Sequence, residues 1–371
     1  MEFSVKKFDL LEEISMMQGV VERKTTIPIL SNALFEAKGG RLTITATDLD
    51  LSIRASCEAK VKKEGSGTIP AKKLMELVRL LPDDEEIRFR LLENHWMQII
   101  CDRKTYKLVG MSRENFPNQP GFPESVVKIP AQLLFSLIAK TSFAISAEES
   151  RYTLNGALFL LKPEMLLMVA TDGHRLALVE ADHKISGLRT ELKVLIPRKA
   201  MAEIQRLIGD ADKDALVEFA EDDSHIFFQF DGRRLISRKL TGQFPNYEAV
   251  LPRGTDKSVI LGRDEFQNAL RRVSQLADQR SHAVKLMLTK EGVELSSSSP
   301  EYGEAKEAIE KEFKGDPVSI GFNAQYILDF LAAAAEGDIS IELKDEQSAG
   351  QMRPLADKSV RYRYVVMPMR I

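Results

Sequence analysis

The sequence contains very little cysteine, since Cys57 and Cys101 are the only two in 371 residues. Neither has the CxxC partner of a zinc knuckle, and two isolated cysteines do not make a disulfide framework. The histidines form no HxxxH or HExxH pair, and the nucleotide-binding motifs GxGxxG and GxxxxGK[ST] are both missing. We therefore expect no metal, no cofactor and a reducing, cytoplasmic setting.

Long hydrophobic runs are missing as well. The longest apolar stretch, Ala157 to Ala170, is interrupted by Lys162, Pro163 and Glu164, and the first residues contain no apolar signal core. The sequence thus predicts neither a targeting segment nor a membrane contact. Charge of one sign is not in excess either, because 52 Lys and Arg face 55 Asp and Glu. Such a balance does not point to nucleic acid, although it allows a basic surface opposite an acidic one.

The sequence does contain a long internal repeat. Residues 68–77 (TIPAKKLMEL) recur as residues 195–204 (LIPRKAMAEI), an offset of 127. Shorter segments recur at similar offsets, namely Ala46–Asp48 with Ala170–Asp172 and Phe116–Asn118 with Phe244–Asn246. Three diverged copies of one domain therefore fill the chain, and we place them at residues 1–124, 125–252 and 253–371.

Each copy combines two kinds of periodicity. Apolar residues recur at helical spacing in two segments of each copy, as in Leu10, Leu11, Ile14 and Met17. Alternation with a period of two, which is typical of strands, follows in segments such as 42–46 and 226–230. Glycine-containing turns separate the strand segments. The sequence predicts an α+β fold in which each copy has two helices and an antiparallel sheet of hairpin-linked strands.

The second predicted helix opens with cations in two of the copies, Lys72 and Lys73 in the first and Arg198 and Lys199 in the second. Cations in the first turn oppose the helix dipole at a cost of up to about 1 kcal/mol. One interpretation is a solvated helix face. The other is a surface that binds a polyanion, because phosphate contacts hold a nucleic acid without reading its sequence.

The segment from Thr171 to Arg175 is the most enzyme-like part of the sequence. Asp172 and His174 would suit an acid/base pair, and an enzyme with a hydrolytic or isomerase site there is one alternative. Asp48 occupies the equivalent place in the first copy, however, so a turn residue of the repeat is the better interpretation of Asp172. A structural repeat protein without a nucleic-acid role is a third alternative.

The last residues, from Tyr364 to Ile371, are apolar where a chain end is usually polar. A final edge strand would explain Tyr364 to Val366. It would not explain Met367, Pro368 and Met369, because proline ends strand pairing and leaves two flexible side chains near the surface. Methionine-lined surfaces adapt to several peptide ligands.

The repeat, the segments 170–176 and 244–247 and the apolar end together resemble the bacterial DNA polymerase III β subunits, or sliding clamps, over the whole chain. The resemblance implies a head-to-tail homodimeric ring of six similar domains, with helices around double-stranded DNA and sheets outside. It implies a protein without catalytic residues that tethers polymerases. The expected partners are duplex DNA without sequence specificity, a second copy of the chain, and polymerases, a clamp loader and other proteins that carry short clamp-binding peptides.

The resemblance also implies a partner-peptide pocket between the second and third copies. Its residues would be Arg151, Leu154, Thr171, Gly173, His174, Arg175, Leu176, Pro245, Val250, Asn323, Tyr326, Val365, Val366, Met367, Pro368, Met369 and Arg370. Ala249 replaces an arginine that is common in this family.

A head-to-tail ring would pair the first copy with the third. We expect the first copy to contribute Arg103, Lys104, Tyr106, Lys107 and Leu108. The third copy would contribute Glu301, Glu304 and nearby Glu307, so that opposite charges flank an apolar centre.

Three further positions rest on comparison with the family. Leu276 matches an interface position, whereas Gln275 and Ser281 stand where other clamps carry apolar residues. Lys24 matches a family DNA contact, which would add to the contacts inferred for Lys72, Lys73, Arg198 and Lys199.

Overall fold

The computed structural model describes residues 1–21, 26–83, 85–124, 127–148, 150–185, 188 and 190–370. The chain forms two compact units. The first unit consists of Met1–Gln132 with Lys199–Lys239, and the second of Leu133–Arg198 with Leu240–Ile371.

The first unit contains an antiparallel five-stranded sheet in the order β5-β1-β7-β8-β9. Its strands are β1 (Glu2–Lys6), β5 (Lys60–Lys63), β7 (Glu86–Leu91), β8 (Met97–Cys101) and β9 (Lys104–Leu108). One face is buried, because Phe3, Phe89 and Ile99 are fully inaccessible and the rings of Phe3 and Phe89 stack with centroids 4.9 Å apart.

An eight-stranded sheet completes the β-structure of the first unit, in the order β10-β15-β16-β17-β4-β3-β2-β6. Its strands from the first copy are β2 (Asn32–Lys38), β3 (Arg41–Thr47), β4 (Leu51–Glu58) and β6 (Gly65–Pro70). Those from the second copy are β10 (Val127–Pro130), β15 (Leu216–Glu221), β16 (His225–Phe230) and β17 (Arg233–Arg238). Antiparallel pairing of β17 with β4 joins the two copies into one sheet.

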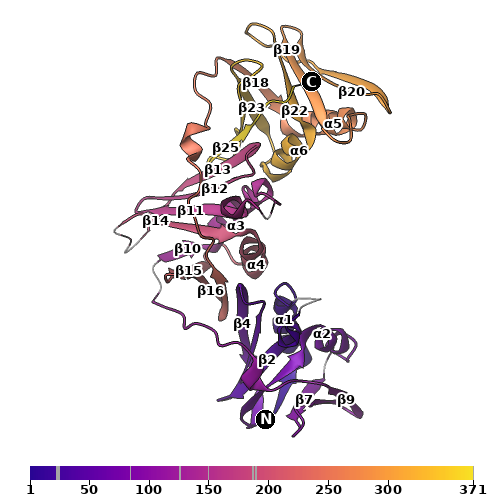
Figure 1. Cartoon of the computed structure of the whole chain (residues 1–371), viewed down its shortest axis with the longest axis vertical. Helices are drawn as coiled ribbons and strands as arrows, with labels where there is room; N and C mark the ends of the chain where they lie inside the picture. The colour runs from indigo at the N-terminus through magenta and orange to yellow at the C-terminus, as the bar shows by residue number, and fades with distance from the viewer. Residues whose placement is uncertain are drawn as a thin grey trace. The chain divides into compact units, whose positions relative to one another are not determined.

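The helices of the first unit form where the sequence predicts them. They are α1 (Lys7–Met17), α2 (Ala71–Arg79) and, apart from its first residue, α4 (Arg198–Ile208). α1 and α2 contact each other beside the sheets (Figure 1), and α1 buries Leu10, Ile14 and Met17. This burial confirms the helical period of its apolar residues.

The second unit repeats this arrangement. Its eight-stranded sheet has the order β14-β11-β12-β13-β25-β24-β23-β18. The strands are β11 (Gly156–Lys162), β12 (Met165–Thr171), β13 (Arg175–Asp182), β14 (Leu192–Pro197), β18 (Lys257–Gly262), β23 (Asp338–Leu343), β24 (Gly350–Pro354) and β25 (Arg361–Val366). Here the pairing of β13 with β25 joins the second copy to the third.

A four-stranded sheet, β21-β20-β19-β22, completes the second unit. It is formed by β19 (Ala283–Thr289), β20 (Gly292–Ser299), β21 (Gly303–Ile309) and β22 (Val318–Asn323). The helices are α3 (Ala131–Ala139, which begins in the first unit), α5 (Arg263–Ser274) and α6 (Ala324–Ala333). As α1 and α2 do, α5 and α6 contact each other beside the strands (Figure 1).

These elements confirm the predicted α+β class with antiparallel sheets and two helices for each copy. The compact units do not follow the copies, because the strands of the second copy divide between two sheets, each shared with a neighbouring copy. The copy boundaries near residues 124 and 252 therefore stay a prediction.

The expectation of a final edge strand is wrong in one respect. Tyr364 to Val366 do form part of a strand, β25, but β25 lies between β13 and β24 in the interior of the sheet. Its pairing on both sides explains why these three residues are almost fully buried.

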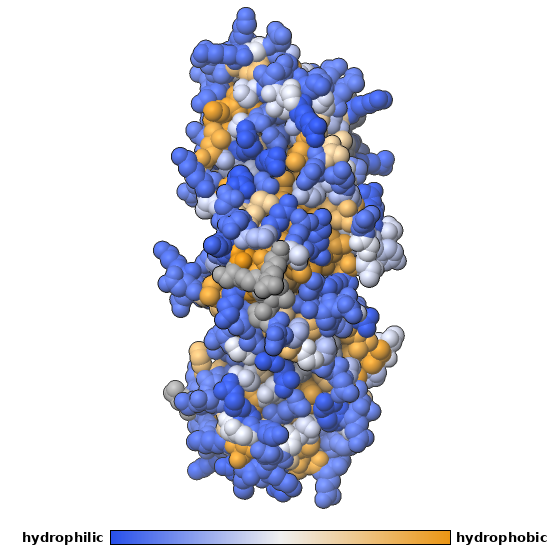
Figure 2. Space-filling model, turned by 90° about the vertical axis from the view of Figure 1, so that its left-hand side faces the viewer, coloured by the Kyte–Doolittle hydropathy of each residue, from blue (hydrophilic) through white to orange (hydrophobic). Residues whose placement is uncertain are grey.

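No helix among the described residues is long and apolar enough to cross a membrane. Figure 2 shows one face of the chain, on which hydrophilic residues predominate and apolar residues gather in separate small patches.

Candidate functional site

The turn between β12 and β13 is organised by Asp172. Its Oδ1 accepts hydrogen bonds from the backbone N–H groups of His174 (2.9 Å) and Arg175 (3.0 Å). In the first copy Oδ1 of Asp48 accepts equivalent bonds from the N–H groups of Asp50 and Leu51. The interpretation of Asp172 as a turn residue of the repeat is thus confirmed. Its carboxylate is occupied by the turn and does not face His174 as an acid/base partner.

Arg175 ties this turn to two other elements. Its guanidinium donates to Asp172 (3.0 Å), to Asp329 of α6 (2.6 Å) and to the carbonyl oxygen of Phe143 (2.7 Å). It also lies 4.4 Å from the centre of the Tyr326 ring, a cation–π distance. Only 10% of its side chain is exposed, so Arg175 supports the site from within.

The charge of Arg175 is stabilised by this environment. Burial lowers the pKa of its guanidinium, but the hydrogen bond to Asp329 and the nearby charges outweigh burial and raise the pKa above its ordinary value. Next to it, burial raises the pKa of Tyr364 strongly, and the neutral hydroxyl donates to the carbonyl oxygen of Tyr326 (2.7 Å).

Arg151 closes the other side of the turn. Its Nη1 donates to the carbonyl oxygen of Asp172 (2.7 Å), and its Nε contacts Glu148 (2.8 Å). Gly173 has φ of 90°, and a Cβ atom there would lie 3.0 Å from Nη1 of Arg151. The turn therefore requires glycine at this position.

The end of the chain is held at two points by its backbone. The N–H of Met367 donates to the carbonyl oxygen of His174 (2.9 Å), and the N–H of Met369 donates to that of Gly321 in β22 (2.8 Å). The side chain of Met367 is 42% exposed. A groove of about 740 Å³ runs beside this segment. Besides residues 367–370 it is lined by Lys285, Ser319, Ile320, Gly321, Glu346 and Gln347.

The predicted pocket residues separate into two groups. Those that are at least partly exposed are Arg151, Leu154, Gly173, His174, Arg175, Pro245, Val250, Asn323, Tyr326, Met367, Pro368, Met369 and Arg370. Thr171, Leu176, Val365 and Val366 are buried. Val365 and Leu176 pair across β25 and β13, so they lie beneath the surface. Asn323 caps α6, because its side chain accepts from the N–H groups of Gln325 and Tyr326.

An apolar wall adjoins the paired strands. Leu240, Phe244, Tyr247 and Leu251 pack against the buried cluster that includes Leu176 and Val365. Val250 is 43% exposed in the same segment, and Ala249 lines a second hollow with Val250 and Lys344.

The prediction missed the residues that hold the site together. Asp329, Phe143 and Tyr364 support Arg175 and Tyr326, and Lys285 and Glu346 line the groove beside the chain end. The repeat offered one signal, since Asp329 stands where the second copy has Glu203. Which group each acid would contact could not be read from the repeat.

The predicted DNA-binding cations differ in whether an acidic side chain already pairs with them. Lys73 pairs with Glu76 on the same helix (2.8 Å), and Lys199 pairs with Asp48. Lys72 and Arg198 are exposed and form no salt bridge within the described part of the chain. Lys24 lies outside the described residues.

Comparison with known proteins covers the whole chain. Sequence models of the N-terminal, central and C-terminal domains of the DNA polymerase III beta subunit match residues 1–120, 128–246 and 248–370. The chain belongs to the DNA polymerase III β subunit family. It is a sliding clamp, a processivity subunit without catalytic activity of its own, as the resemblance implied, and the enzyme alternative at Asp172 and His174 is wrong.

Individual relatives agree with the family assignment. The beta sliding clamps of Pseudomonas aeruginosa and Caulobacter vibrioides are 33% and 36% identical to this chain over the full length of both proteins. A crystal structure of the Bartonella birtlesii sliding clamp bound to griselimycin superimposes with a TM-score of 0.94 at 34% identity, with complete coverage of both chains. The predicted homodimeric ring on DNA is consistent with the family to which the chain belongs.

The predicted dimer residues of this clamp lie at two open sheet edges. β9 is the last strand of its sheet, with Tyr106 and Leu108 half-buried, and Lys104 and Lys107 exposed. Arg103 precedes it in an exposed turn. β21 is the last strand of the four-stranded sheet and carries Glu304, with Glu301 in the preceding turn.

Several residues expected at the dimer interface already make contacts within their own chain. Glu307 already binds Arg272 of α5 through Nε (3.0 Å), so it is not free to pair with the first copy. Ser281 donates to Asp278 in a tight turn, through its backbone N–H (2.9 Å) and its hydroxyl (3.1 Å). Leu276 is half-buried just beyond α5, and Gln275 caps that helix.

Proposed function

We propose that partner peptides of this clamp dock on the surface formed by the chain end, residues 367–370, the β12–β13 turn and the start of α6. The observation that carries the proposal is the two-point attachment of the chain end. Its backbone is bonded to the turn before β13 and to β22, so the methionine side chains are presented on a backbone that is already ordered. A surface that is already ordered loses less entropy when a peptide binds.

The expected ligand is a short peptide with a polar anchor followed by Leu and Phe. The apolar side chains of the peptide would fill the space between the two methionines and the apolar wall near Val250. His174 and Tyr326, whose ring centroids lie 6.4 Å apart, would contact the peptide in this space. A few buried apolar anchors give micromolar affinity, about 8 kcal/mol, which allows partners to exchange on one ring.

The test is calorimetric titration of such a peptide into the Met367→Ser/Met369→Ser variant. We expect at least tenfold weaker binding, about 1.4 kcal/mol, because two apolar side chains are removed while the backbone bonds stay. The control is Leu355→Ser, which removes an apolar side chain that is 41% exposed outside this surface. Unchanged affinity in the double variant, with normal sedimentation, would overturn the assignment.

The remaining roles follow the same reasoning. We infer that Lys72 and Arg198 contact DNA phosphates most directly, with Lys73 and Lys199 contributing less because acids already occupy them. Pairing of β9 of one chain with β21 of a second chain would close the ring, because each edge strand leaves backbone groups unpaired in the single chain.

As a replication protein, the clamp would act in the cytoplasm, where bacterial chromosomes are copied.

A further inference from the structure

The five-stranded sheet has a strongly cationic face on the side away from the core. Residues two apart on a strand share a face, and Phe3 and Phe89 point into the core. Glu2, Ser4, Arg88 and Arg90 therefore point outward. The strand register sets Lys63, Glu2 and Arg90 side by side in one row, and Lys60, Ser4 and Arg88 in the next.

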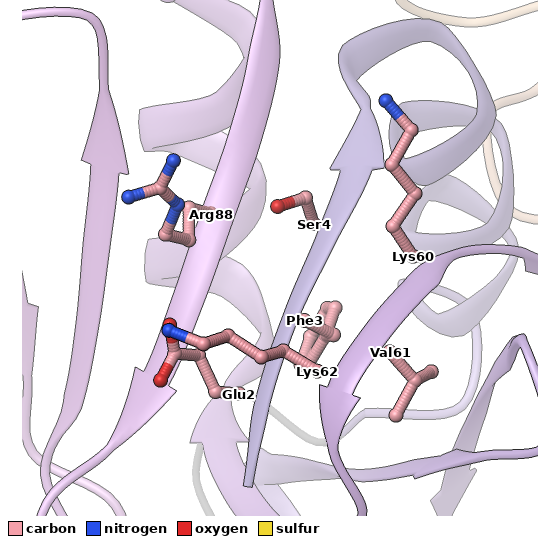
Figure 3. A pocket seen from close by; sticks show the side chains of 7 residues that line it. All are labelled: Glu2, Phe3, Ser4, Lys60, Val61, Lys62 and Arg88. Carbon is pink, nitrogen blue, oxygen red and sulfur yellow. The ribbon is translucent and has the colours of Figure 1, made fainter.

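Figure 3 shows part of this face as a shallow hollow over β5, β1 and β7. The Lys62 ammonium lies beside Glu2 (3.0 Å), while Lys60 pairs with Glu86 (2.9 Å). Lys63, Arg88 and Arg90 are exposed and form no salt bridge in the described part of the chain. Three cations are thus left without an acid partner.

The electrostatic effect of these cations is visible at Glu2. The hydrogen bond from Lys62 lowers the pKa of this carboxyl, and the charges of Arg90 and Arg88 lower it further. The face therefore favours a negative group at its centre.

The composition of the face favours a flexible polyanion over a folded protein. A protein interface normally has a buried apolar or aromatic centre. The two rows on β5, β1 and β7 contain only charged and hydroxyl side chains, and the apolar residues at the hollow, Phe3 and Val61, pair with each other between the rows. A phosphate backbone needs no apolar centre, because cations alone can hold it.

One aromatic residue lies at the end of the same hairpin. Trp96 is the only tryptophan of the chain, and 37% of it is exposed. It lies two residues before Gln98, which pairs with Arg90, so alternation places Trp96 on the cationic side. A second hollow adjoins this turn. Its lining combines the cations Lys63 and Arg90 with Glu2 and Glu93, and it also includes Met1, Leu91, Leu92 and Asn94. The side chain of Asn94 accepts from the N–H of Trp96 (3.2 Å).

We propose that this outer face binds single-stranded nucleic acid, with Lys63, Arg88 and Arg90 contacting phosphates and Trp96 stacking on a base. Cations along a track with an aromatic side chain are the elements of sequence-independent single-strand binding. The face is opposite to the side on which Phe3 and Phe89 are buried, and it contains none of the helix cations assigned to duplex DNA. It also shares no residue with the partner-peptide surface.

The experiment is a fluorescence titration of the dimeric clamp with the oligonucleotide dT12 at low salt. We expect saturable quenching of Trp96, with a dissociation constant of roughly 10⁻⁴ to 10⁻⁶ M and a slope of log K against log salt near −2, from about 0.7 for each of three cations. The Arg88→Glu/Arg90→Glu variant should bind at least tenfold more weakly.

Two controls separate this face from other sites. Lys290→Glu/Lys311→Glu makes the same charge change at two residues of the third copy that do not belong to this face, and it should stay within twofold of the unmodified clamp. Lys72→Ala/Arg198→Ala should also leave the quenching unchanged, although it weakens the contacts to duplex DNA.

Three results would overturn the proposal. They are quenching that survives in Arg88→Glu/Arg90→Glu, an equal loss in the Lys290→Glu/Lys311→Glu control, and displacement of dT12 by an oligoglutamate of equal charge at equal concentration. The last result would assign the face to an acidic protein segment. If the arginine variant does not elute as a folded dimer, Lys63→Glu, at the third of the cations assigned to phosphates, provides the same test with a smaller expected loss.

Discussion

Equivalent acids in the repeat receive their counter-charge from different places. Asp48 and Asp172 organise the same turn in two copies. Asp48 is paired with Lys199 of a later helix, whereas Asp172 is paired with Arg175 of its own turn. Arg175 in turn binds Asp329, whose equivalent in α4, Glu203, pairs with Arg206. The repeated turns thus keep the acidic residue but differ in the cation that pairs with it. As a result, only the turn at Asp172 is linked to α6 and lies beside the methionines of residues 367–370.

The first prediction concerns Arg175. Replacing it by Met should lower the free energy of unfolding by about 3 kcal/mol, because Asp172 and Asp329 lose their buried counter-charge. Urea unfolding is the measurement, with peptide titration as a second readout that should also weaken. Arg238→Met, at a residue whose side chain is 63% exposed beside Asp50, is the control and should change stability by less than about 0.5 kcal/mol. A decrease smaller than about 1 kcal/mol for Arg175→Met would contradict the role assigned to it.

The second prediction concerns pH. Lys140 and Asp357 form an ion pair of 3.0 Å with side chains only 11% and 16% exposed. Burial works to raise the pKa of Asp357, but hydrogen bonds from Ser359 and Lys140 outweigh it and lower the pKa. The folded protein thus holds this proton less tightly than the unfolded chain. The resulting stability is present above the unfolded pKa of about 3.9 and is lost as pH falls through the folded pKa.

Unfolding of Asp357→Asn at several pH values tests this sign. The variant should be less stable by about 1 to 2 kcal/mol at about pH 6. The difference should shrink as the pH falls below about 4. Lys140→Met should show the same pH trend, and the double variant should be little less stable than either single one. A difference that grows towards acid pH would show that the ion pair does not control this stability.

The elements of this clamp join across copies by strand pairing rather than by helix packing alone. β17 pairs with β4 in the first unit, and β25 pairs with β13 in the second. Among the strands that stay at sheet edges within one chain are β9 and β21, the two that carry the predicted dimer residues. On β9, Tyr106 and Leu108 pair with Ile99 and Met97, so they lie on the core side of the sheet while still half-exposed. Covering them would complete an apolar seam.

The third prediction therefore places a charge in that seam. Leu108→Asp should weaken the dimer at least a hundredfold, about 2.7 kcal/mol, because an unpaired carboxylate would be buried at the interface. Sedimentation at micromolar concentration should then show a monomer. Thr105→Asp, on the outer side of the same strand, should leave a dimer. A dimeric Leu108→Asp variant would exclude this edge as the interface.

Charge is distributed over the whole molecule more unevenly than its sum suggests. The net charge is only −3, yet the first unit has cations that form no salt bridge with any described residue, both on α2 and on the outer face of the five-stranded sheet. Many acidic residues form salt bridges within the chain, such as Asp48 with Lys199 and Glu13 with Arg233. A balanced composition can thus support nucleic-acid contacts, because the field depends on which charges are unpaired.

The fourth prediction tests which helix cations contact the phosphates of the encircled DNA. Lys72→Ala/Arg198→Ala should shorten retention on closed circular DNA and reduce the slope of log retention against log salt by up to about 1.8, since each phosphate that is no longer neutralised accounts for about 0.9. Lys73→Ala/Lys199→Ala, which removes cations already paired with acids, should have a smaller effect. Retention should disappear in every case when the circle is cut. Equal effects of the two pairs would contradict the distinction drawn between them.

The repeat, the positions of the helices and strands, and the family all follow from the order of residues in the chain. These features depend on local periodicity and on short motifs such as residues 170–176 and 365–370, which are present in the linear sequence whatever the chain contacts. The same reasoning led correctly to Asp172 as a turn residue, because a neighbouring copy carries the same acid without the histidine.

Which of the predicted residues are available to partners depends instead on the folded chain. Lys199 and Asp48 are 151 residues apart, and Arg175 and Asp329 are 154 apart, so no local pattern indicates that they meet. The same holds for β25, which the sequence could place at an edge but which lies between two strands from different copies. The gathering of cations on the outer face of β1, β5 and β7 follows from strand register, and register is set by which buried side chains pack together across the sheet.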